Sequence, residues 1–361
     1  MALLLVVGSA LCPAHANQLA SGPVPGMDLA ACSDDILSLG LAPDPYVRLA
    51  VPSDVVVVVI LVTLFSAFLL ELLPGDPVTT LVPYGSDEQR AEIREDLNLD
   101  DPFMVRYGRW LGDIVTGDLG RYYSVSSIEP VADRVWEALP ISLTLMVYAQ
   151  LLALVVAIPL GVLTAYRNGT FFDRMSSGAA FAMLAIPNFA LGFVLQYYFG
   201  VKLGWFSASG YTAISESFRD HFRTMVLPAI TLSVGQIVVY MRLLRSDMIS
   251  TLQQDFILMA KAKGLTTRRV LFRHALRPSS LTLLTVAGLN VGTLIGGTLI
   301  IEVVFNIPGM GLLLFEAISR RQIVAFQSMV AVIAVLYVLV NFAVDALYSV
   351  LDPRIRHAEN A

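Results

Sequence analysis

The chain has 361 residues, of which 56% are hydrophobic and 15% charged, with a mean hydropathy of +0.69 and a net charge of −5. This composition carries more apolar surface than one soluble core can bury, so it indicates a membrane protein and excludes an ordinary soluble domain. Two cysteines near the N-terminus and four scattered histidines exclude a disulfide framework and give no pair of metal ligands at helical spacing. We therefore expect no metal site.

Residues 1–50 are expected to form an N-terminal extension. An apolar run over residues 2–11 is followed by Ala14-His15-Ala16, which resembles a signal-peptide cleavage site, but no positive residue precedes the run. The Pro, Gly and Asp content of the following residues equally fits a disordered extension or a start codon assigned too far upstream. The sequence leaves these three interpretations open.

Six apolar stretches are long enough to cross a bilayer, which takes about 20 residues in a helix. They cover residues 51–73, 138–165, 175–203, 225–245, 279–304 and 323–351. Asp54 and Glu71 leave the first stretch barely long enough. The predicted fold class is therefore an all-α membrane protein with six transmembrane helices.

Loop charges predict how these helices are oriented, because cytoplasmic loops are enriched in Lys and Arg. The segment 74–137 holds 13 acidic residues and 6 arginines, a net charge of −7, and is expected outside the cell membrane. The loop 248–278 with its flanks, from Arg242 to Arg277, holds eight basic and two acidic residues, a net charge of +6, and is expected in the cytoplasm together with the C-terminus. Five aspartates before the first span oppose the cytoplasmic N-terminus that six spans require, but the +6 loop should dominate.

The cytoplasmic loop begins with a predicted short helix. Asp255 can cap its start by accepting backbone N–H bonds, and Gly264 can end it in a left-handed conformation. Lys261 and Lys263 fall in its last turn, where the helix dipole favours positive charge. Thr266 or Thr267 is then expected to cap a second helix over residues 268–277, and Pro278 to mark the turn into the next span.

The first of these helices is too short to be stable alone in water. It is expected to expose the four apolar residues 256–259 outside the membrane spans. Such a helix needs a covering surface, which is either another protein or the inner leaflet of the membrane. The residues alone do not decide between the two.

The sequence Asp255-Phe-Ile-Leu-Met-Ala-Lys-Ala-Lys-Gly264-Leu265, followed by Arg268-Arg-Val-Leu-Phe-Arg-His-Ala-Leu-Arg277, resembles the EAA loop of ABC-transporter permeases in its dipeptide/oligopeptide/nickel subfamily. The resemblance implies a coupling helix that sits in a cleft of an ATPase subunit. The residues to which it assigns this contact are Asp255, Phe256, Met259, Ala260, Lys261, Lys263, Gly264 and Leu265. Leu258 and Met259 stand where the glutamate and first alanine of the motif would be, which leaves open the polar contact that this glutamate makes elsewhere.

Further segments resemble the same subfamily in order and spacing. They are Leu73–Pro77, Gly117–Gly120, Ile186–Gly192, Leu203–Tyr211, Asn306–Gly311 and Val340–Arg354. The resemblance implies one transmembrane domain over residues 51–356, a short tail over 357–361, and a type I importer permease fold in a prokaryotic inner membrane. Its implied partners are a second homologous permease, two ABC ATPase subunits or domains that bind ATP and Mg, an extracytoplasmic substrate-binding protein and membrane lipid, with no nucleic acid.

No G-x-x-x-x-G-K-[ST] phosphate loop occurs in the sequence, so we expect this chain itself to bind no ATP and to have no catalytic residue. A membrane enzyme would need a chemical constellation that the sequence does not show. An ion-coupled secondary transporter would need no ATPase, but neither an intramembrane carboxylate pair nor an inverted repeat is visible. The favoured interpretation is a permease for dipeptides or oligopeptides, with nickel or another small solute as alternatives.

Several residues inside the spans are candidates for further roles. Gly288, Gly292 and Gly296 leave one face of the fifth span bare, which suits close helix packing against a second permease or within this subunit. Gln236 and Asn290 are expected to line the translocation pathway or to join helices. Glu302 lies near a span end, where interfacial water is expected to solvate it.

Overall fold

The computed structural model describes the backbone of residues 47–351 except 73, 83–85 and 124–127, and the side chains of residues 56–344 with the same gaps. The chain divides into two units, Met1–Val57 and Val58–Ala361. The first unit contributes only the start of a helix to the described residues. The predictions for residues 1–46 and for the tail 357–361 therefore lie outside the described part of the chain.

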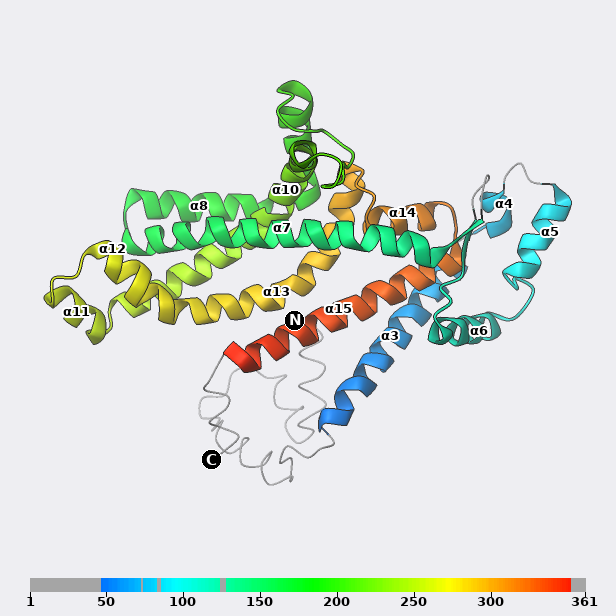
Figure 1. The fold of residues 1–361 in the computed structure, drawn as a ribbon, viewed down its shortest axis with the longest axis horizontal. Helices are drawn as coiled ribbons and strands as arrows, with labels where there is room; N and C mark the ends of the chain where they lie inside the picture. The colour runs from blue at the N-terminus through cyan, green and yellow to red at the C-terminus, as the bar shows by residue number, and fades with distance from the viewer. Residues whose placement is uncertain (1–46, 73, 83–85, 124–127, 352–361) are drawn as a thin grey trace, which may run out of the picture. The chain divides into compact units, whose positions relative to one another are not determined.

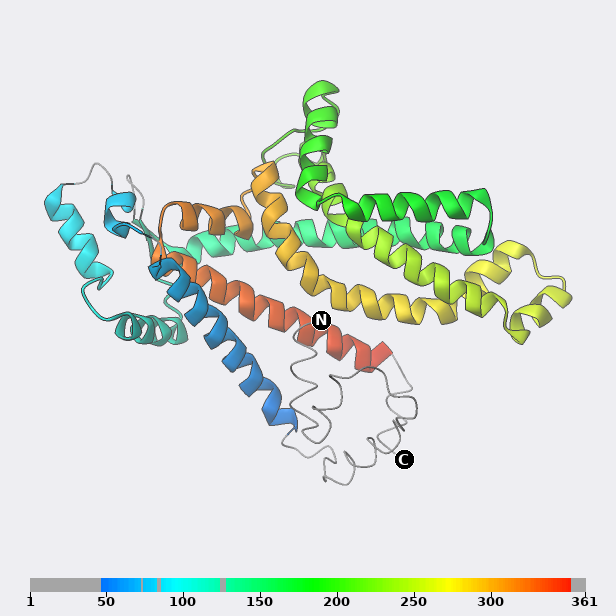
Figure 2. The same ribbon diagram turned by 180° about the vertical axis from the view of Figure 1, so that it is seen from behind.

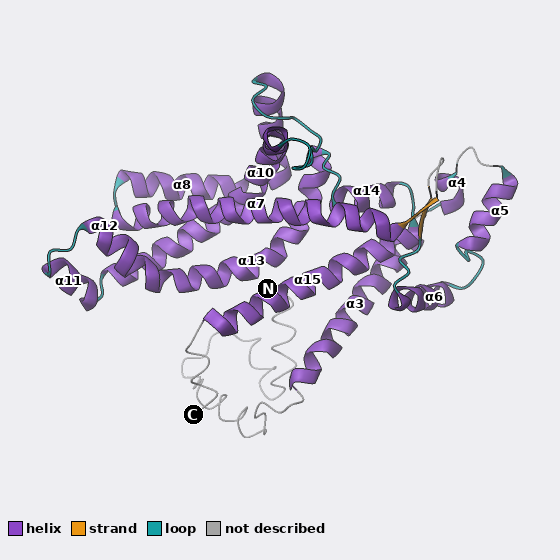
Figure 3. Ribbon diagram, in the orientation of Figure 1, coloured by secondary structure: helices purple, strands orange, loops and turns teal. Residues whose placement is uncertain are grey.

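The described residues are predominantly helical (Figure 3). The α-helices are α3 (Val47–Glu71), α4 (Pro77–Leu81), α5 (Asp87–Asp96), α6 (Phe103–Thr116), α7 (Val131–Tyr166), α8 (Phe171–Ala185), α9 (Asn188–Leu195), α10 (Phe218–Leu252), α11 (Asp255–Ala262), α12 (Thr267–Arg269), α13 (Leu276–Phe305), α14 (Met310–Ser319) and α15 (Ile323–Leu351). Two π-helical segments, η2 (Gln196–Lys202) and η3 (Val270–Ala275), follow α9 and α12. Strands β1 (Arg121–Tyr123) and β2 (Ile128–Pro130) form an antiparallel hairpin in which Tyr122 pairs with Glu129.

Four helices in the described residues are long and apolar enough to cross a membrane: α7, α10, the continuous run from α12 through α13, and α15. The pair formed by α8 and α9–η2 would make a fifth span if counted as one. The described apolar part of α3, Val56–Glu71, is shorter. The structure thus supports a polytopic helical membrane protein, while the sequence predicts six spans.

The predicted span 175–203 is not one straight helix, because α8 and α9 are bent by 100° at Ile186 and Pro187. Ile186 has an extended backbone, with φ −91° and ψ 122°. A proline disfavours the helical conformation of the residue before it, so Pro187 ends α8 and starts α9 in a new direction. The hydropathy of the stretch hid this break, because both halves are apolar.

The core forms where α10 packs along α7 and α13 (Figures 1 and 2). The face of α7 that meets α10 carries small residues at four-residue intervals, all of them buried: Ala149, Ala153, Ala157, Gly161 and Ala165. A Cβ on Gly161 would lie 3.1 Å from the Leu244 side chain of α10. Small residues let two helix backbones approach closely inside a membrane, so this stripe sets the spacing of the bundle.

The connection from α13 to α14 folds around a buried carboxylate. Glu302 is 0% exposed, and its Oε2 atom accepts the Gly311 N–H bond at 2.6 Å at the start of α14. The expectation that interfacial water solvates Glu302 is therefore wrong, because the chain turns back over this side chain at Gly309. Gly311 also lies so close to α13 that a Cβ there would be 2.3 Å from the carbonyl oxygen of Leu299.

The described residues of the segment 74–137, predicted as a large loop, form helices α4 to α6, the β1–β2 hairpin and the first turns of α7. Its hairpin is tied to α15, since the Tyr123 N–H donates to Gln322 Oε1 at 3.1 Å. The Trp110 indole N–H of α6 donates to Ser328 Oγ at 2.9 Å. Burial and a hydrogen bond to the Asp96 carboxylate raise the pKa of Tyr123 above its usual value. In both views α5 and α6 lie beyond one end of α7, while α11 and α12 lie at its other end (Figures 1 and 2).

Gly311→Ala should destabilise the purified protein by about 1–3 kcal/mol, because the added methyl group would overlap the α13 backbone and force helices α13 and α14 apart. Thermal unfolding in detergent measures the change. Gly296→Ala is the matched control, since a Cβ at Gly296 in α13 meets no atom within 4 Å. Equal stability of the two variants would contradict the close α13–α14 crossing.

Candidate functional site

The end of α10 leads into a helical hairpin formed by α11, α12 and η3. The turn after α11 has Gly264 in the left-handed region, with φ +75°. The Gly264 N–H donates to the Lys261 carbonyl at 2.9 Å and the Leu265 N–H to the Ala260 carbonyl at 3.3 Å. These two bonds are those of a Schellman motif, so the predicted glycine stop of the first helix is confirmed.

Two details of the hairpin differ from the sequence prediction. Gln254, not Asp255, occupies the cap position of α11, and no side chain bonds the free N–H groups there. Pro278 does not interrupt the chain, since it lies in the first turn of α13 and the helix is continuous from Thr267 to Phe305. In a regular α-helix its ring would meet the His274 carbonyl oxygen, and the wider π-helical turn η3 directly before it removes this clash.

Helix α11 divides its apolar residues between two surfaces. Ile257 and Ala260 are buried in a cluster that includes Leu244 and Met248 of α10. The prediction that Ile257 is exposed is therefore wrong. Three other large apolar side chains remain exposed: Phe256 by 46%, Leu258 by 55% and Met259 by 58%. The helix is thus held firmly by one face and offers an apolar surface with the other.

Basic side chains surround this surface. Lys261 and Lys263 follow the apolar residues of α11, and further exposed arginines lie on the second arm of the hairpin and the start of α13: Arg268, Arg269, Arg273 and Arg277. Among the described residues none of these six cations forms an ion pair. The hairpin therefore combines an apolar centre with a positive rim, an arrangement that resembles a protein interface more than a lone surface loop.

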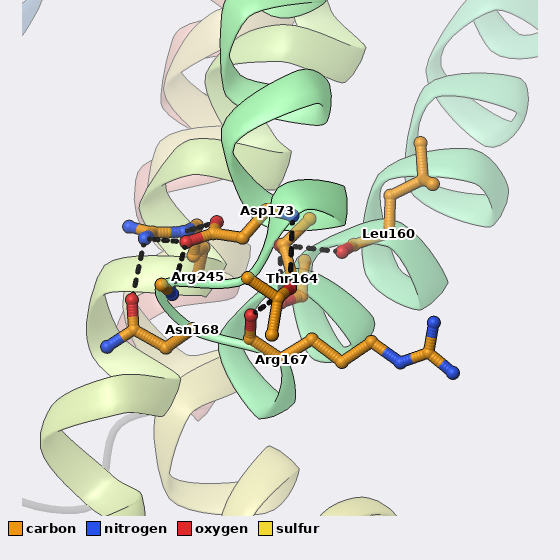
Figure 4. A network of polar contacts seen from close by, with 9 residues as sticks. Leu160, Thr164, Arg167, Asn168, Asp173 and Arg245 are labelled. Atoms are coloured by element: carbon orange, nitrogen blue, oxygen red, sulfur yellow. Dashed lines mark hydrogen bonds and ion pairs between the residues drawn. The ribbon is translucent and has the colours of Figure 1, made fainter.

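A buried ion pair joins α10 to the turn between α7 and α8 (Figure 4). Arg245 of α10 donates through Nε to Asp173 Oδ1 at 2.6 Å and through Nη2 to Asp173 Oδ2 at 2.7 Å. The same Nη2 donates to Asn168 Oδ1 at 3.0 Å, and the Gly169 N–H donates to Asp173 Oδ2 at 2.9 Å. The Asp173 side chain is 5% exposed and that of Arg245 26%.

Sequence reasoning missed this network. Asn168-Gly-Thr170 matches a glycosylation motif and nothing in the sequence links it to Arg245, which lies 77 residues away. The structure gives these residues a local role, since Thr170 caps α8 and Asn168 bonds the arginine. A sequence feature that could have indicated this network is Asp173, a single aspartate next to a membrane span on the side expected to be cytoplasmic.

The two predicted pathway residues lie in different surroundings. Gln236 is half-buried on α10, and its Nε2 donates to Thr293 Oγ1 of α13 at 3.2 Å. Asn290 lies beside the buried Tyr240, whose hydroxyl group donates to Gln150 Oε1 of α7 at 3.1 Å. The structure therefore places Asn290 in a network that joins α7, α10 and α13, and does not bring it together with Gln236.

The three glycines of α13 also have different neighbours. A Cβ on Gly292 would lie 2.9 Å from Tyr337 and 3.1 Å from Asn341, both on α15. Gly296 is exposed, with no atom near its missing side chain, and Gly288 is half-buried. Gly292 thus packs within this chain, whereas Gly296 is open to a partner. In the described residues no group of three or more His, Cys, Asp or Glu side chains is placed to hold a metal ion.

The model of the family "Binding-protein-dependent transport system inner membrane component" matches residues 157–357, which include α10, the hairpin and α13. A probable peptide ABC transporter permease protein, y4tP of Sinorhizobium fredii, is 35% identical over 84% of this chain and 96% of its own length. The chain belongs to this family. The resemblance seen in the sequence is therefore confirmed.

A second curated relative agrees with this assignment. It is the oligopeptide transport system permease protein AppB of Bacillus subtilis, which is 36% identical to this chain. The match covers 82% of this chain and 94% of AppB. Among solved structures, an inward-facing MetNI methionine ABC transporter has a TM-score of 0.49 and 17% identity, covering 60% of this chain and 96% of that one. The family and the apolar helices make the protein a multi-pass inner membrane component.

Breaking the Asp173–Arg245 pair should destabilise this inner membrane component by about 3 kcal/mol, because the remaining charge is left without its partner in a mostly buried site. Asp173→Asn and Arg245→Gln should therefore cost much less together than the sum of the two single changes. Thermal unfolding of the four proteins measures this coupling. The exposed pair Arg109–Asp101 is the control, and Asp101→Asn should cost under about 1 kcal/mol. Additive effects at Asp173 and Arg245 would contradict the proposed strength of the pair.

Proposed function

We propose that the chain is the membrane-spanning permease subunit of an ATP-driven importer for dipeptides or oligopeptides. It forms the translocation pathway with a second homologous permease, and two ABC ATPase subunits or domains bind the ATP and Mg that drive it. The observation that carries the proposal is the exposed apolar face of α11 at the end of α10. The peptide substrate is inferred from the relatives y4tP and AppB, which are named as peptide and oligopeptide permeases.

The coupling contact is assigned to the exposed face of α11. Phe256, Leu258 and Met259 are about half exposed, so each would gain about 1 kcal/mol if a partner buried the rest of its surface, which favours docking of an ATPase subunit at this point. Lys261 and Lys263 would meet acidic groups at the edge of the partner surface. Because Ile257 and Ala260 fix α11 to the end of α10, movement of the partner is passed to the membrane helices rather than lost in a flexible loop.

The remaining residues of the predicted contact have structural parts in the same proposal. Asp255 lies in the first turn of α11 with its side chain exposed, so it can meet a donor of the partner. Ala260 lets α11 lie close to its own hairpin, while Gly264 and Leu265 close the turn. Gly288, Gly292 and Gly296 lie near the second permease in this proposal. Gly296 contacts it, and Gly292 lets α15 pack closely against α13.

The orientation of the chain follows from its charges. The stretch from Arg242 to Arg277, which includes the hairpin and has a net charge of +6, lies in the cytoplasm in this proposal. The segment 74–137, with −7, lies outside. The two lie beyond opposite ends of α7 (Figure 1). The C-terminus is then cytoplasmic, and the acidic segment is free to meet an extracytoplasmic substrate-binding protein.

Met259→Asp should reduce copurification of the ATPase subunits at least tenfold, because it places a charge in an apolar contact and burying an unpaired carboxylate costs several kcal/mol. The measurement is the ATPase recovered with the tagged permease, together with ATP-dependent uptake of a labelled tripeptide. Met104→Asp is the control, since Met104 is 66% exposed on α6 at the other end of α7. Full ATPase recovery with Met259→Asp would overturn the proposed coupling contact.

Reversing three charges on α5 should slow capture of the substrate-binding protein. Glu88, Glu92 and Glu95 are exposed and follow one face of the helix. Changing them to lysine moves the charge of the segment from −7 to −1, which weakens long-range attraction of a basic surface. We expect the association rate to fall about tenfold at low salt and to depend less on salt. The matching glutamine variant, with −4, should lie between, and an unchanged rate in both would exclude this docking surface.

A further inference from the structure

Three polar side chains from different membrane segments lie in the region where α9, α10 and α13 meet. Asn188 begins α9, Gln236 lies near the middle of α10 and Thr293 near the middle of α13. The Gln236 amide donates to the Thr293 hydroxyl group at 3.2 Å. Asn188 lies over Gly235, since its Oδ1 atom is 4.0 Å from the position of a Cβ there. We call Asn188, Gln236 and Thr293 the neutral polar site.

This site is open. Asn188 and Thr293 are exposed and Gln236 is half-buried. In the described residues the Asn188 side chain makes no hydrogen bond. By contrast, Gln150 bonds both Tyr240 and the Ala287 carbonyl, and Gln196 bonds the Ala208 carbonyl at 2.7 Å. The Gln236–Thr293 bond also joins two helices, and Thr293 donates to the Asn290 carbonyl at 2.7 Å. Asn188 and the Gln236 carbonyl oxygen, however, keep donors and acceptors unused in the described residues.

An open amide is costly if it faces lipid. An unbonded amide in hydrocarbon costs several kcal/mol, so polar groups in membrane helices face the protein interior or a water-filled cavity. The residues around Asn188 are apolar and exposed, among them Ile186 and Phe189, so no neighbouring charge solvates it. The face that carries the site must therefore border water or a polar ligand during the transport cycle.

The surroundings restrict which ligand fits. The stretches 175–201, 225–241 and 278–301 contain no Asp, Glu, Lys or Arg. The site therefore offers neutral donors and acceptors and no charge, which suits a group that both donates and accepts hydrogen bonds without a net charge. On the same helices, Gly235 of α10 and Gly296 of α13 present no protruding side chains, and Gly296 has no atom near its missing side chain. An extended peptide chain can lie against such a smooth surface.

We propose that Asn188, Gln236 and Thr293 bind the main-chain amides of a peptide as it crosses the membrane. This inference rests on the proposed function as a peptide permease. A contact to the main chain is independent of peptide side chains, so one site serves peptides of different sequence. Gln236, Asn188 and Thr293 thus line the translocation pathway, whereas Asn290 joins helices.

The first test is water access in the complete importer in proteoliposomes. After Cys12 and Cys32 are replaced by alanine, Asn188→Cys and Thr293→Cys should react with a charged, membrane-impermeant methanethiosulfonate, and trialanine should slow the reaction. Leu284→Cys is the matched control, since Leu284 is 47% exposed on the face of α13 opposite Thr293 and should stay unreactive in lipid. Unreactive cysteines at positions 188 and 293 would mean that a second permease or lipid covers the site, and would overturn the inference.

The second test is a substrate in which an ester replaces one main-chain amide of trialanine. The ester lacks one N–H donor, so the parent complex should take it up about threefold to tenfold more slowly than the amide. Asn188→Leu and Gln236→Leu should bring this ratio close to one, whereas a purely structural defect would slow both substrates equally. Asn290→Leu is the control that should keep the parent ratio.

The outcomes separate the two proposals. If the parent complex hydrolyses ATP but moves no peptide, the proposed peptide substrate fails, and reactive cysteines without protection by trialanine then count against the inference too. If the parent complex moves peptides but all variants keep the parent ester ratio, the proposed function stands and only the neutral polar site is refuted.

Discussion

The close packing of α7 against α10 is the constraint on which the remaining structure depends. Ala149, Ala153, Ala157, Gly161 and Ala165 present a nearly smooth face, so the larger side chains of α10 can settle directly on the α7 backbone. In a membrane, where lipid is as apolar as the helices, such packing rather than the hydrophobic effect drives association. Helix α10 is thereby fixed along its length, and it carries Gln236, Arg245 and the connection to α11.

This fixed helix explains why its inner end can transmit force. Ile257 of α11 is buried with Met248 of α10, so the apolar contact on the other face of α11 acts on α10 directly. Arg245 adds a second link, because its bidentate bond to Asp173 ties α10 to the start of α8. A partner that binds at α11 therefore acts on α10 and α8 together, and the bend at Pro187 lies at the far end of α8.

The sequence predicted those features that depend on local composition, and it failed where distant residues decide. Long apolar runs located α7, α10, α13 and α15, and Gly264 located the end of α11. Hydropathy could not show the break at Pro187, because apolar residues flank it on both sides. The burial of Glu302 required the chain to turn back at Gly309, and the pair of Asp173 with Arg245 joins residues 72 positions apart.

The hydrogen bonding of polar side chains in the spans distinguishes structural residues from candidate functional residues more clearly than charge or glycine patterns do. A polar group whose donor and acceptor atoms are both bonded, such as the Gln150 amide, lowers the free energy of one arrangement of helices and needs no ligand. A polar group that is exposed on a membrane face keeps an unfavourable solvation energy until water or a ligand meets it. Sequence alone ranks Gln236 and Asn290 equally, because both are amides in apolar helices. Their bonding partners separate them, since Asn290 lies beside Tyr240 in the core, while Gln236 bonds the exposed Thr293.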